Sequence, residues 1–209
     1  MRARNTVLSV VLATAGALCL IAGVASANTL SLSNRQIRTT WARLEFIGEW
    51  EGGAQIGNYC AVTLEGSFHS STLRKVAGAL VGHLTRASVA RCQLELITVS
   101  PLALPWHIRY QGFRGTLPTL TGLSIDVVGM SWDLNSGGIR CLYRSTTARP
   151  AAASILVTRG VLSALTFSGA VPKGVEDIFC SLPTQLLMLG SSGPVTLLGT
   201  TTAVTVTLI

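Results

Sequence analysis

The sequence predicts an all-β protein: an antiparallel β-sandwich or barrel-like domain of about ten short strands, stapled by disulfides and preceded by an N-terminal signal peptide. Three observations support this prediction. Apolar and polar residues alternate with a period of two along many short segments, which is typical of strands with one buried face. Glycine and proline separate these segments, as they do at the turns of antiparallel sheets. The cysteines that follow the leader are even in number.

The first 27 residues have the features of a secretory signal peptide. Two arginines stand in the first four residues, residues 7–24 are almost continuously apolar, and Ala25-Ser26-Ala27 is a small-x-small cleavage motif before Asn28. The alternative is a retained membrane anchor, because the apolar run is near the lower limit for crossing a bilayer. The cleavage motif argues against it. We therefore expect a protein that is secreted, extracellular or on the cell surface and that does not span the membrane after cleavage.

Cleavage leaves residues 28–209, which is 209 − 27 = 182 residues and enough for a single secreted β domain with a full core. The net charge of +7 includes the two leader arginines, so the mature domain carries +5. Its basic residues are scattered and form no stripe, so we expect no nucleic-acid partner. A basic exported protein attracts anionic polymers, and a cell-envelope or extracellular polymer is the candidate partner.

Four cysteines remain after cleavage: Cys60, Cys92, Cys141 and Cys180. In an exported chain an even number indicates two structural disulfides, for which three connectivities are possible. We favour Cys60–Cys92 with Cys141–Cys180, since each pair then closes a loop of a few strands and contributes about 3–4 kcal/mol. Four zinc ligands are the alternative. The spacings of about thirty to fifty residues and the lack of a C-x-x-C pair disfavour it.

The N-terminal half contains one clear strand and two ambiguous segments. Residues 28–33 form a loose start or a short edge strand, and residues 36–47 fit either a strand or a helix. Residues 48–57 hold four glycines and are expected to turn. Cys60 to Phe68 alternates clearly, with Gly66 as a candidate bulge.

Residues 72–84 carry conflicting signals. Their apolar residues trace one face of an amphipathic helix. Gly78 and Gly82 would cost such a helix about 2 kcal/mol together, and the β segments on either side favour a strand. The sequence leans towards a strand and leaves both structures open.

The centre of the chain predicts the core. Residues 92–99 indicate a strand and residues 100–105 a loop. Trp106, Ile108 and Tyr110 then alternate with polar residues, and after a glycine-rich interval residues 123–127 alternate again. Further strands are expected over 139–143, 155–158, 161–167, 175–182, 184–189, 195–198 and 203–209, with turns at Arg159-Gly160 and 199–202.

No catalytic or metal-binding pattern stands out. His69, His83 and His107 are the only histidines, and none has a partner at the spacing of a metal motif. A Ser–His–Asp set using His107 and Asp126 is conceivable, but no G-x-S-x-G elbow is present. We expect no catalytic residue, no cofactor and no metal, and a protein that is not an enzyme. A secreted hydrolase of unknown type is the alternative.

Three weaker patterns suggest a carboxylate pair, a calcium loop and a sugar-binding platform. Glu49 and Glu51 flank Trp50 like the carboxylate pair of a glycosidase. They lie in a glycine-rich segment, however, which is typical of a solvated turn. Residues 133–137 have the start of a calcium loop but lack its third acidic ligand and its terminal glutamate. The aromatic residues would form a sugar-binding platform if several were exposed. The candidate residues for such a platform are Trp41, Trp50, Tyr59, Trp106, Tyr110, Trp132 and Tyr143. Trp50 is the one most expected at the surface, whereas Trp106 and Trp132 are expected in the core.

Four segments carry a resemblance: 60–69, 104–110, 115–118 and the closing 199–209. Together they resemble a group of uncharacterised secreted proteins of high-GC Gram-positive soil bacteria. The stretch from Cys60 through Trp106 is also similar to secreted alkane-oxidation-activator (PraB-like) proteins, which are linked to the cell surface and biofilm. The first group carries no established activity, so the resemblance transfers no functional residue. The signal peptide, the paired cysteines, the strand pattern and the missing catalytic pattern instead lead us to expect a secreted or cell-surface β-domain protein of unknown molecular function, with a binding or structural role.

The signal-peptide interpretation makes a direct prediction. Protein recovered from the culture medium should begin at Asn28, since cleavage follows the Ala-Ser-Ala motif. Mass spectrometry of the intact secreted chain measures this. Material that retains residues before Asn28 would contradict the predicted site.

Overall fold

The computed structural model describes residues 29–49, 55–94, 97–116, 118–136, 139–174, 180 and 184–209. This part of the chain is all-β and holds no helix that could cross a membrane. Its strands are β1 (Thr29–Leu32), β2 (Gln36–Glu49), β3 (Gln55–Phe68), β4 (Thr72–Arg74), β5 (Leu80–Ala90), β6 (Ile97–Leu102), β7 (Trp106–Arg114), β8 (Gly122–Val128), β9 (Ser131–Ser136), β10 (Ile139–Arg144), β11 (Ala151–Thr158), β12 (Val161–Phe167), β13 (Val171–Pro172), β14 (Gln185–Leu189), β15 (Thr196–Leu197) and β16 (Val206–Leu208).

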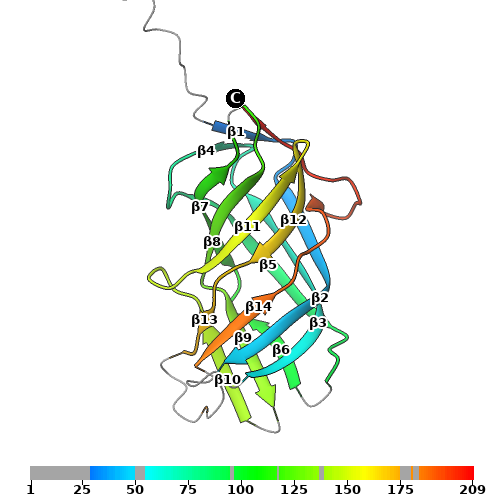
Figure 1. The fold of residues 1–209 in the computed structure, drawn as a ribbon, viewed down its shortest axis with the longest axis vertical. Coiled ribbons are helices and arrows are strands. Elements are labelled where there is room, and N and C mark those ends of the chain that lie inside the picture. Colours follow the sequence, from blue (N-terminus) through cyan, green and yellow to red (C-terminus); the bar gives the residue numbers. More distant parts are fainter. Residues whose placement is uncertain are drawn as a thin grey trace, which may run out of the picture.

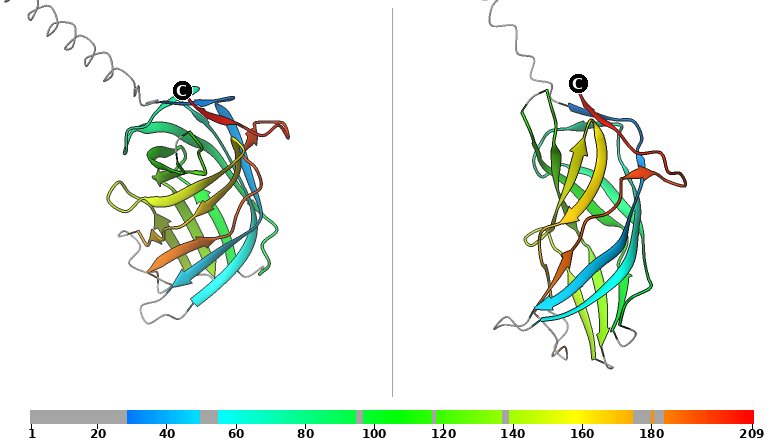
Figure 2. Two further views of the ribbon diagram at one scale, coloured as in Figure 1. Left: turned by 45° about the horizontal axis from the view of Figure 1, so that its top comes forward. Right: turned by 45° about the vertical axis from the view of Figure 1, so that its right-hand side comes forward.

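One large antiparallel sheet forms the body of the molecule. Its strand order is β12-β11-β8-β7-β5-β3-β2-β14-β13, and β15 pairs with β2 beside this path. Figures 1 and 2 show the sheet strongly curled, so that β12 at one end of the order comes round towards β2. The inward face of the curl carries the alternating apolar residues and encloses the core.

The segment after β14 closes this curl. On one side, the backbone amides of Ser192 and Val195 donate to carbonyls of β12, at Leu165 and Leu162. On the other side, the amide of Gly193 donates to the carbonyl of Thr40 on β2. Figure 1 shows this orange-to-red segment running between the two strands. The fold is therefore barrel-like, with an irregular segment completing the wall.

Two three-stranded sheets lie at opposite ends of the body (Figure 1). The sheet of order β16-β1-β4 joins the first described strand to the last, with Leu30 opposite both Leu73 and Leu208. The sheet of order β10-β9-β6 lies at the other end. The first sheet adds buried leucines to the core and the second adds Trp132, Leu134 and Tyr143, so the core spans all three sheets.

Aromatic contacts join the sheet of order β10-β9-β6 to the large sheet. The Trp132 ring on β9 packs edge-on against Trp106 of β7, with ring centroids 5.0 Å apart, and against Phe46 of β2 at 5.2 Å. These are favourable geometries for aromatic pairs. Trp41 of β2 stacks on Phe167 of β12 at 5.7 Å, across the closed curl. Trp106 and Trp132 are fully buried, as the sequence predicted.

The structure contains both disulfides in the favoured connectivity, Cys60–Cys92 and Cys141–Cys180. The first ties β3 to the residues that follow β5. The second ties β10 to the chain before β14. The zinc alternative is therefore wrong, because all four sulfur atoms are in covalent pairs.

The two ambiguous segments are strands. Residues 36–49 form β2, one of the two longest strands, and residues 72–84 contain β4, a turn and the start of β5. Gly78 has a positive φ of 79° in that turn, a conformation that glycine adopts without strain and a helix does not allow. The Arg159-Gly160 turn is also confirmed, with φ angles of 53° and 78° that suit a tight hairpin between β11 and β12.

Several boundaries differ from those predicted. The described residues form sixteen strands rather than about ten, and β2 and β3 are longer than the short strands expected. The strand expected over 92–99 begins only at Ile97, and Ser100 to Leu102, expected in a loop, complete it as β6. β9 was not predicted, because its polar positions resemble a loop. Residues 175–179 and 181–183, within the weak strand expected over 175–182, lie outside the described residues.

Two glycines allow β3 and β5 to approach closely. A Cβ at Gly66 would lie 2.2 Å from the carbonyl oxygen of His83, and one at Gly82 would lie 2.5 Å from that of Ser67. Both distances are far below van der Waals contact, and both obstacles are backbone. The register shifts between Glu65 and Gly66, which confirms the predicted bulge.

The burial of Trp106 predicts a large effect on stability. Trp106→Ala should lower the free energy of unfolding by about 3–5 kcal/mol, the usual cost of removing a large buried aromatic. His107→Ala, on the exposed face of the same strand, should change it by about 0.5 kcal/mol or less. Denaturant unfolding of the two variants measures both values. Equal stabilities would contradict the inward orientation of Trp106.

The close approach of β3 and β5 predicts a second effect. Gly66→Ala should destabilise the domain by about 2 kcal/mol or more, because the new methyl group meets backbone that cannot move aside without breaking the pairing. Gly112→Ala is the matched control, since a Cβ there has nothing within 4 Å. Thermal melts compare the two. A Gly66 variant as stable as the Gly112 variant would show that the strands can separate freely.

Candidate functional site

Hydroxyl side chains form a row across the outer face of the large sheet. Ser124 of β8 pairs with Ser154 of β11, Ser154 pairs with Thr166 of β12, and Thr166 forms a bridge to Ser191 in the closing segment. In β8 and β11 the alternate residues are buried, so these hydroxyls belong to the outward set. Three strands and the closing segment thus contribute to one polar row.

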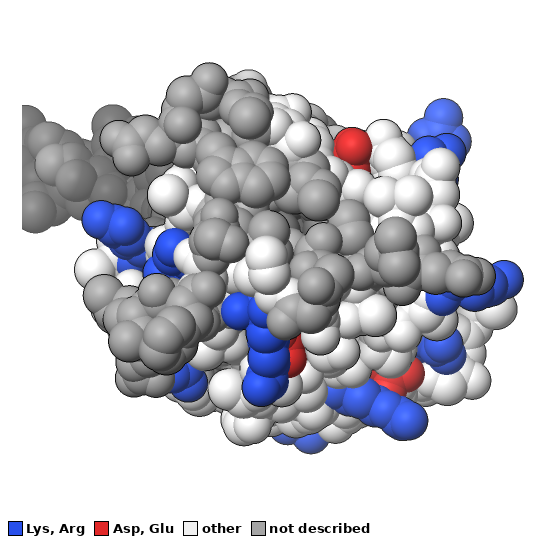
Figure 3. Space-filling view, turned by 90° about the horizontal axis from the view of Figure 1, so that it is seen from below, with Lys and Arg blue, Asp and Glu red and all other residues white. Residues whose placement is uncertain are grey.

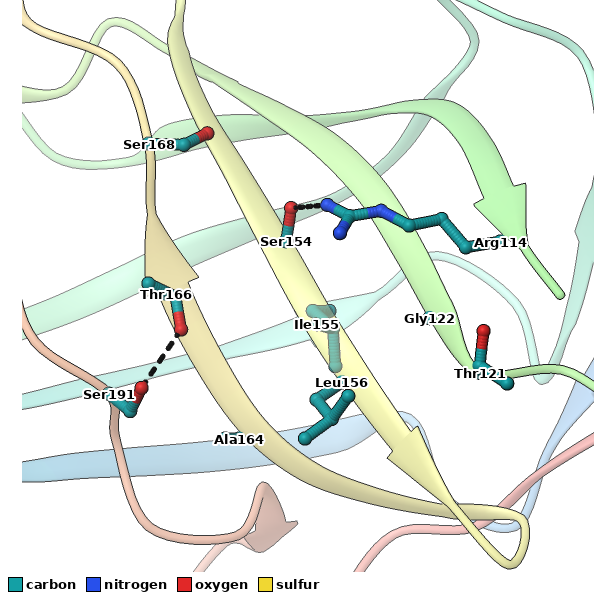
Figure 4. A pocket seen from close by; sticks show the side chains of 10 residues that line it. All are labelled: Arg114, Thr121, Gly122, Ser154, Ile155, Leu156, Ala164, Thr166, Ser168 and Ser191. Atoms are coloured by element: carbon teal, nitrogen blue, oxygen red, sulfur yellow. Dashed lines mark hydrogen bonds between the residues drawn. The ribbon is translucent and has the colours of Figure 1, made fainter.

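This row crosses an open groove of about 370 Å³. Figure 4 shows the groove over β11 and β12, with Arg114 reaching across β8 to Ser154 and Thr166 facing Ser191. Its lining comprises Arg114, Thr121, Gly122, Ser154, Ile155, Leu156, Ala164, Thr166, Ser168 and Ser191.

The groove is hollow because its outward positions carry small residues. Gly122 and Ala164 lie beside Leu156 in the register of β8, β11 and β12. A Cβ at Gly122 would sit 3.2 Å from the carbonyl oxygen of Ile155, within the floor of the groove. Leu156 is 54% exposed and gives the groove an apolar surface beside its hydroxyls. The arrangement therefore combines hydrogen-bonding groups with a patch that fits the C–H face of a bound molecule.

Arg114 supplies the charge of the groove. Its guanidinium donates a hydrogen bond to the Ser154 hydroxyl, which fixes the side chain over the sheet. The remaining guanidinium donors suit an anionic group, because planar guanidinium binds carboxylate in paired hydrogen bonds. No carboxylate is among the lining residues, all of which are described.

Asp126 lies two residues beyond Ser124 on β8 and is held by a different partner. It accepts a 2.6 Å hydrogen bond from the Gln111 amide. Burial raises the pKa of the Asp126 carboxyl, while the Gln111 hydrogen bond and the charge of Arg109 act in the opposite direction. In the register of β7 and β8, His107 lies opposite Val128 and Asp126 lies opposite Arg109, and the hydrogen-bond partner of the Asp126 carboxylate is Gln111 rather than His107.

The closing segment positions one wall of the groove. The Ser191 hydroxyl is 3.2 Å from that of Thr166. The buried Ser192 hydroxyl accepts from the amide of Leu165 at 2.8 Å and donates to the carbonyl of Gly193 at 2.6 Å. The wall is therefore fixed by the same hydrogen bonds that close the curl.

The structure also brings two of the histidines together. Nε2 of His69 lies 3.1 Å from Nδ1 of His83, and His83 pairs directly with His107 across β5 and β7. Among the residues that the structure describes, no group of three or more His, Cys, Asp or Glu side chains is placed to hold a metal ion. Sequence spacing could not show the histidine pair, because His69 follows β3 and His83 lies on β5, and only the pairing of these strands brings them together.

Five of the seven candidate aromatic residues cannot contribute to a sugar-binding platform at the surface. Trp41, Trp106, Tyr110, Trp132 and Tyr143 are all buried. Trp50 and Glu51 lie outside the described residues, and so does the side chain of Glu49.

Tyr59 is only partly buried, and the Arg43 guanidinium lies 4.0 Å from its ring centroid. A hydrogen bond with Glu45 raises the Tyr59 pKa. In the candidate calcium loop, Asp133 is paired with Arg140 at 2.7 Å. A carboxylate held by a guanidinium in this way is a poor start for a calcium site.

A second hollow, of about 440 Å³, lies between β10, the chain that follows it and β13. Arg144, Arg149 and Lys173 line it, and the Lys173 ammonium donates to the carbonyl of Cys180. Glu176 and Asp177 follow closely in the chain and lie outside the described residues. Figure 3, which views the molecule from below, shows Lys and Arg side chains dispersed among few acidic ones. The second hollow borders residues 175–179, which lie outside the described part of the chain, whereas the residues that line the hydroxyl groove lie within described segments. The hydroxyl groove is therefore the candidate site.

No family model, curated protein or solved structure matches this chain.

Proposed function

We propose that the mature chain is a secreted or cell-surface protein that binds an acidic polysaccharide of the cell envelope or extracellular matrix in the hydroxyl groove. The observation that carries this proposal is the row Ser154, Thr166 and Ser191 beside the Arg114 guanidinium. Hydroxyls both donate and accept hydrogen bonds, which suits the hydroxyl groups of a sugar chain. Arg114 suits the carboxylate of an acidic sugar.

The shape of the groove supports an extended ligand. It lies open along the outer face of β11 and β12 rather than closing over a small molecule. Exposed Leu156 offers an apolar contact for the face of a sugar ring. The +5 charge of the mature domain adds a general attraction for acidic polymers, which salt weakens.

The lining favours binding over hydrolysis. It contains serine and threonine hydroxyls but no histidine or carboxylate to activate one of them. The two disulfides are typical of proteins that work in an oxidising compartment, which supports an extracellular location.

The test measures binding of the mature protein to polygalacturonate, with neutral dextran as the uncharged polymer. Arg114→Ala should weaken binding to polygalacturonate by about tenfold or more, because a charge-assisted hydrogen bond contributes about 1.5–3 kcal/mol. Ser154→Ala should weaken it by a smaller factor, since a neutral hydroxyl is lost and Arg114 loses its anchor.

Arg74→Ala is the matched control, because it removes the same charge from an exposed position on β4, outside the groove. It should leave the affinity within about twofold. Equal weakening by the Arg74 and Arg114 variants would show that net charge alone attracts the polymer. Absence of saturable binding to polygalacturonate would overturn the proposal.

A further inference from the structure

Three strands place all the histidines of the chain in one region of the outer surface. His69 directly follows β3, His83 lies on β5 and His107 on β7, and these strands are neighbours in the large sheet. His83 is directly opposite His107 in the antiparallel register. Opposed residues in such a pair have Cβ atoms about 4.5–5.5 Å apart. This region is distinct from the hydroxyl groove, whose lining includes none of the three.

His69 and His83 present ring nitrogens to one another. Nε2 of His69 and Nδ1 of His83 are 3.1 Å apart, and the ring centroids are 5.3 Å apart at an interplanar angle of 50°. Two imidazoles that bind one tetrahedral Zn²⁺ at about 2.0–2.1 Å have ligand nitrogens roughly 3.3 Å apart. The observed separation is within a few tenths of an ångström of that value, so a small opening of the pair accommodates an ion.

The surroundings leave the ring edges accessible. His69 is exposed and His83 is partly exposed. The Arg35 guanidinium donates to the backbone carbonyl of His69 at 3.4 Å and not to its ring. Ser67 is the other cross-strand neighbour of His83, and its side chain is small. Solvent molecules can therefore complete the coordination of an ion held by the pair.

The chain offers few competing ligands of the same kind. Its three histidines are the only imidazoles, and Cys60, Cys92, Cys141 and Cys180 are all disulfide-bonded, so the domain presents no thiolate. Imidazole is a preferred ligand of Zn²⁺, Cu²⁺ and Ni²⁺. We propose that His69 and His83 form an exchangeable two-histidine site for a divalent transition-metal ion of this class on the outer face of β3 and β5.

The geometry assigns different roles to the two pairs. Only His69 and His83 have ring nitrogens in contact, whereas His107 is placed beside them by register alone. Because an ion held by two ligands loses the benefit of their shared placement when one is removed, each of the pair is needed for binding. His107 is not needed, and it serves as the matched control on the same surface.

The experiment titrates Zn²⁺ into the mature, oxidised protein without a polyhistidine tag and follows binding by calorimetry. We expect one ion per chain in the wild type. His69→Ala and His83→Ala should each weaken the affinity by about tenfold or more, and His107→Ala should change it by less than about threefold. Histidine ring NMR signals of the wild type provide a second measurement, in which His69 and His83 should shift on addition of Zn²⁺.

Three outcomes would overturn the proposal. One is the absence of saturable Zn²⁺ binding, in which case the two rings form only a hydrogen-bonded pair. Another is a loss of affinity in the His107 variant equal to that in the His83 variant, which would require a three-histidine site. The last is an unchanged ring NMR signal for His69 or His83 in the wild type at saturating Zn²⁺. This measurement needs no variant, so it decides the matter even if a variant fails to fold.

Discussion

The hydrogen bonds of the closing segment, residues 190–195, close the curl of the large sheet and cover the edge of β12. A curled sheet that stopped at β12 would expose the backbone edge of that strand, and such an edge is open to pairing with other chains. Residues 190–195 occupy this position and bond to β12 on one side and to β2 on the other. The stacked Trp41 and Phe167 rings reinforce the same junction from inside. The core is therefore enclosed, and Ser191 is held against Thr166 at the rim of the groove.

Much of the fold could be predicted because period-two alternation survives in the strands that bury one face. The Trp106 strand, the Val161–Phe167 strand and the disulfide pairing follow from local pattern and cysteine spacing. β9 escaped prediction because Asp133 and Asn135 occupy its outward positions and resemble a loop. The helical periodicity of residues 72–84 arose from β4 and the start of β5, whose apolar residues lie on either side of a turn. The sheet order, with β3 paired to β5 rather than β4, depends on long-range contacts that no local pattern specifies.

The candidate site could not be predicted for a related reason. Ser154, Thr166 and Ser191 are unremarkable in sequence, and only the strand register aligns them. The histidine pair is similar: fourteen residues separate His69 from His83, yet their rings touch. His69 and His83 each lie one residue beyond Phe68 and Gly82, which pair across β3 and β5. This relation becomes visible only once the pairing of β3 with β5 is known.

The small outward residues of β8, β11 and β12 separate recognition from folding. Gly122 and Ala164 face the groove, while Leu123, Ile155 and Leu165 beside them face the core. Exchanging an outward residue reshapes the groove without repacking the interior, and the alternation of the strands keeps the two sets of positions independent. Libraries restricted to these outward positions can therefore vary the shape of the groove while the same scaffold is retained.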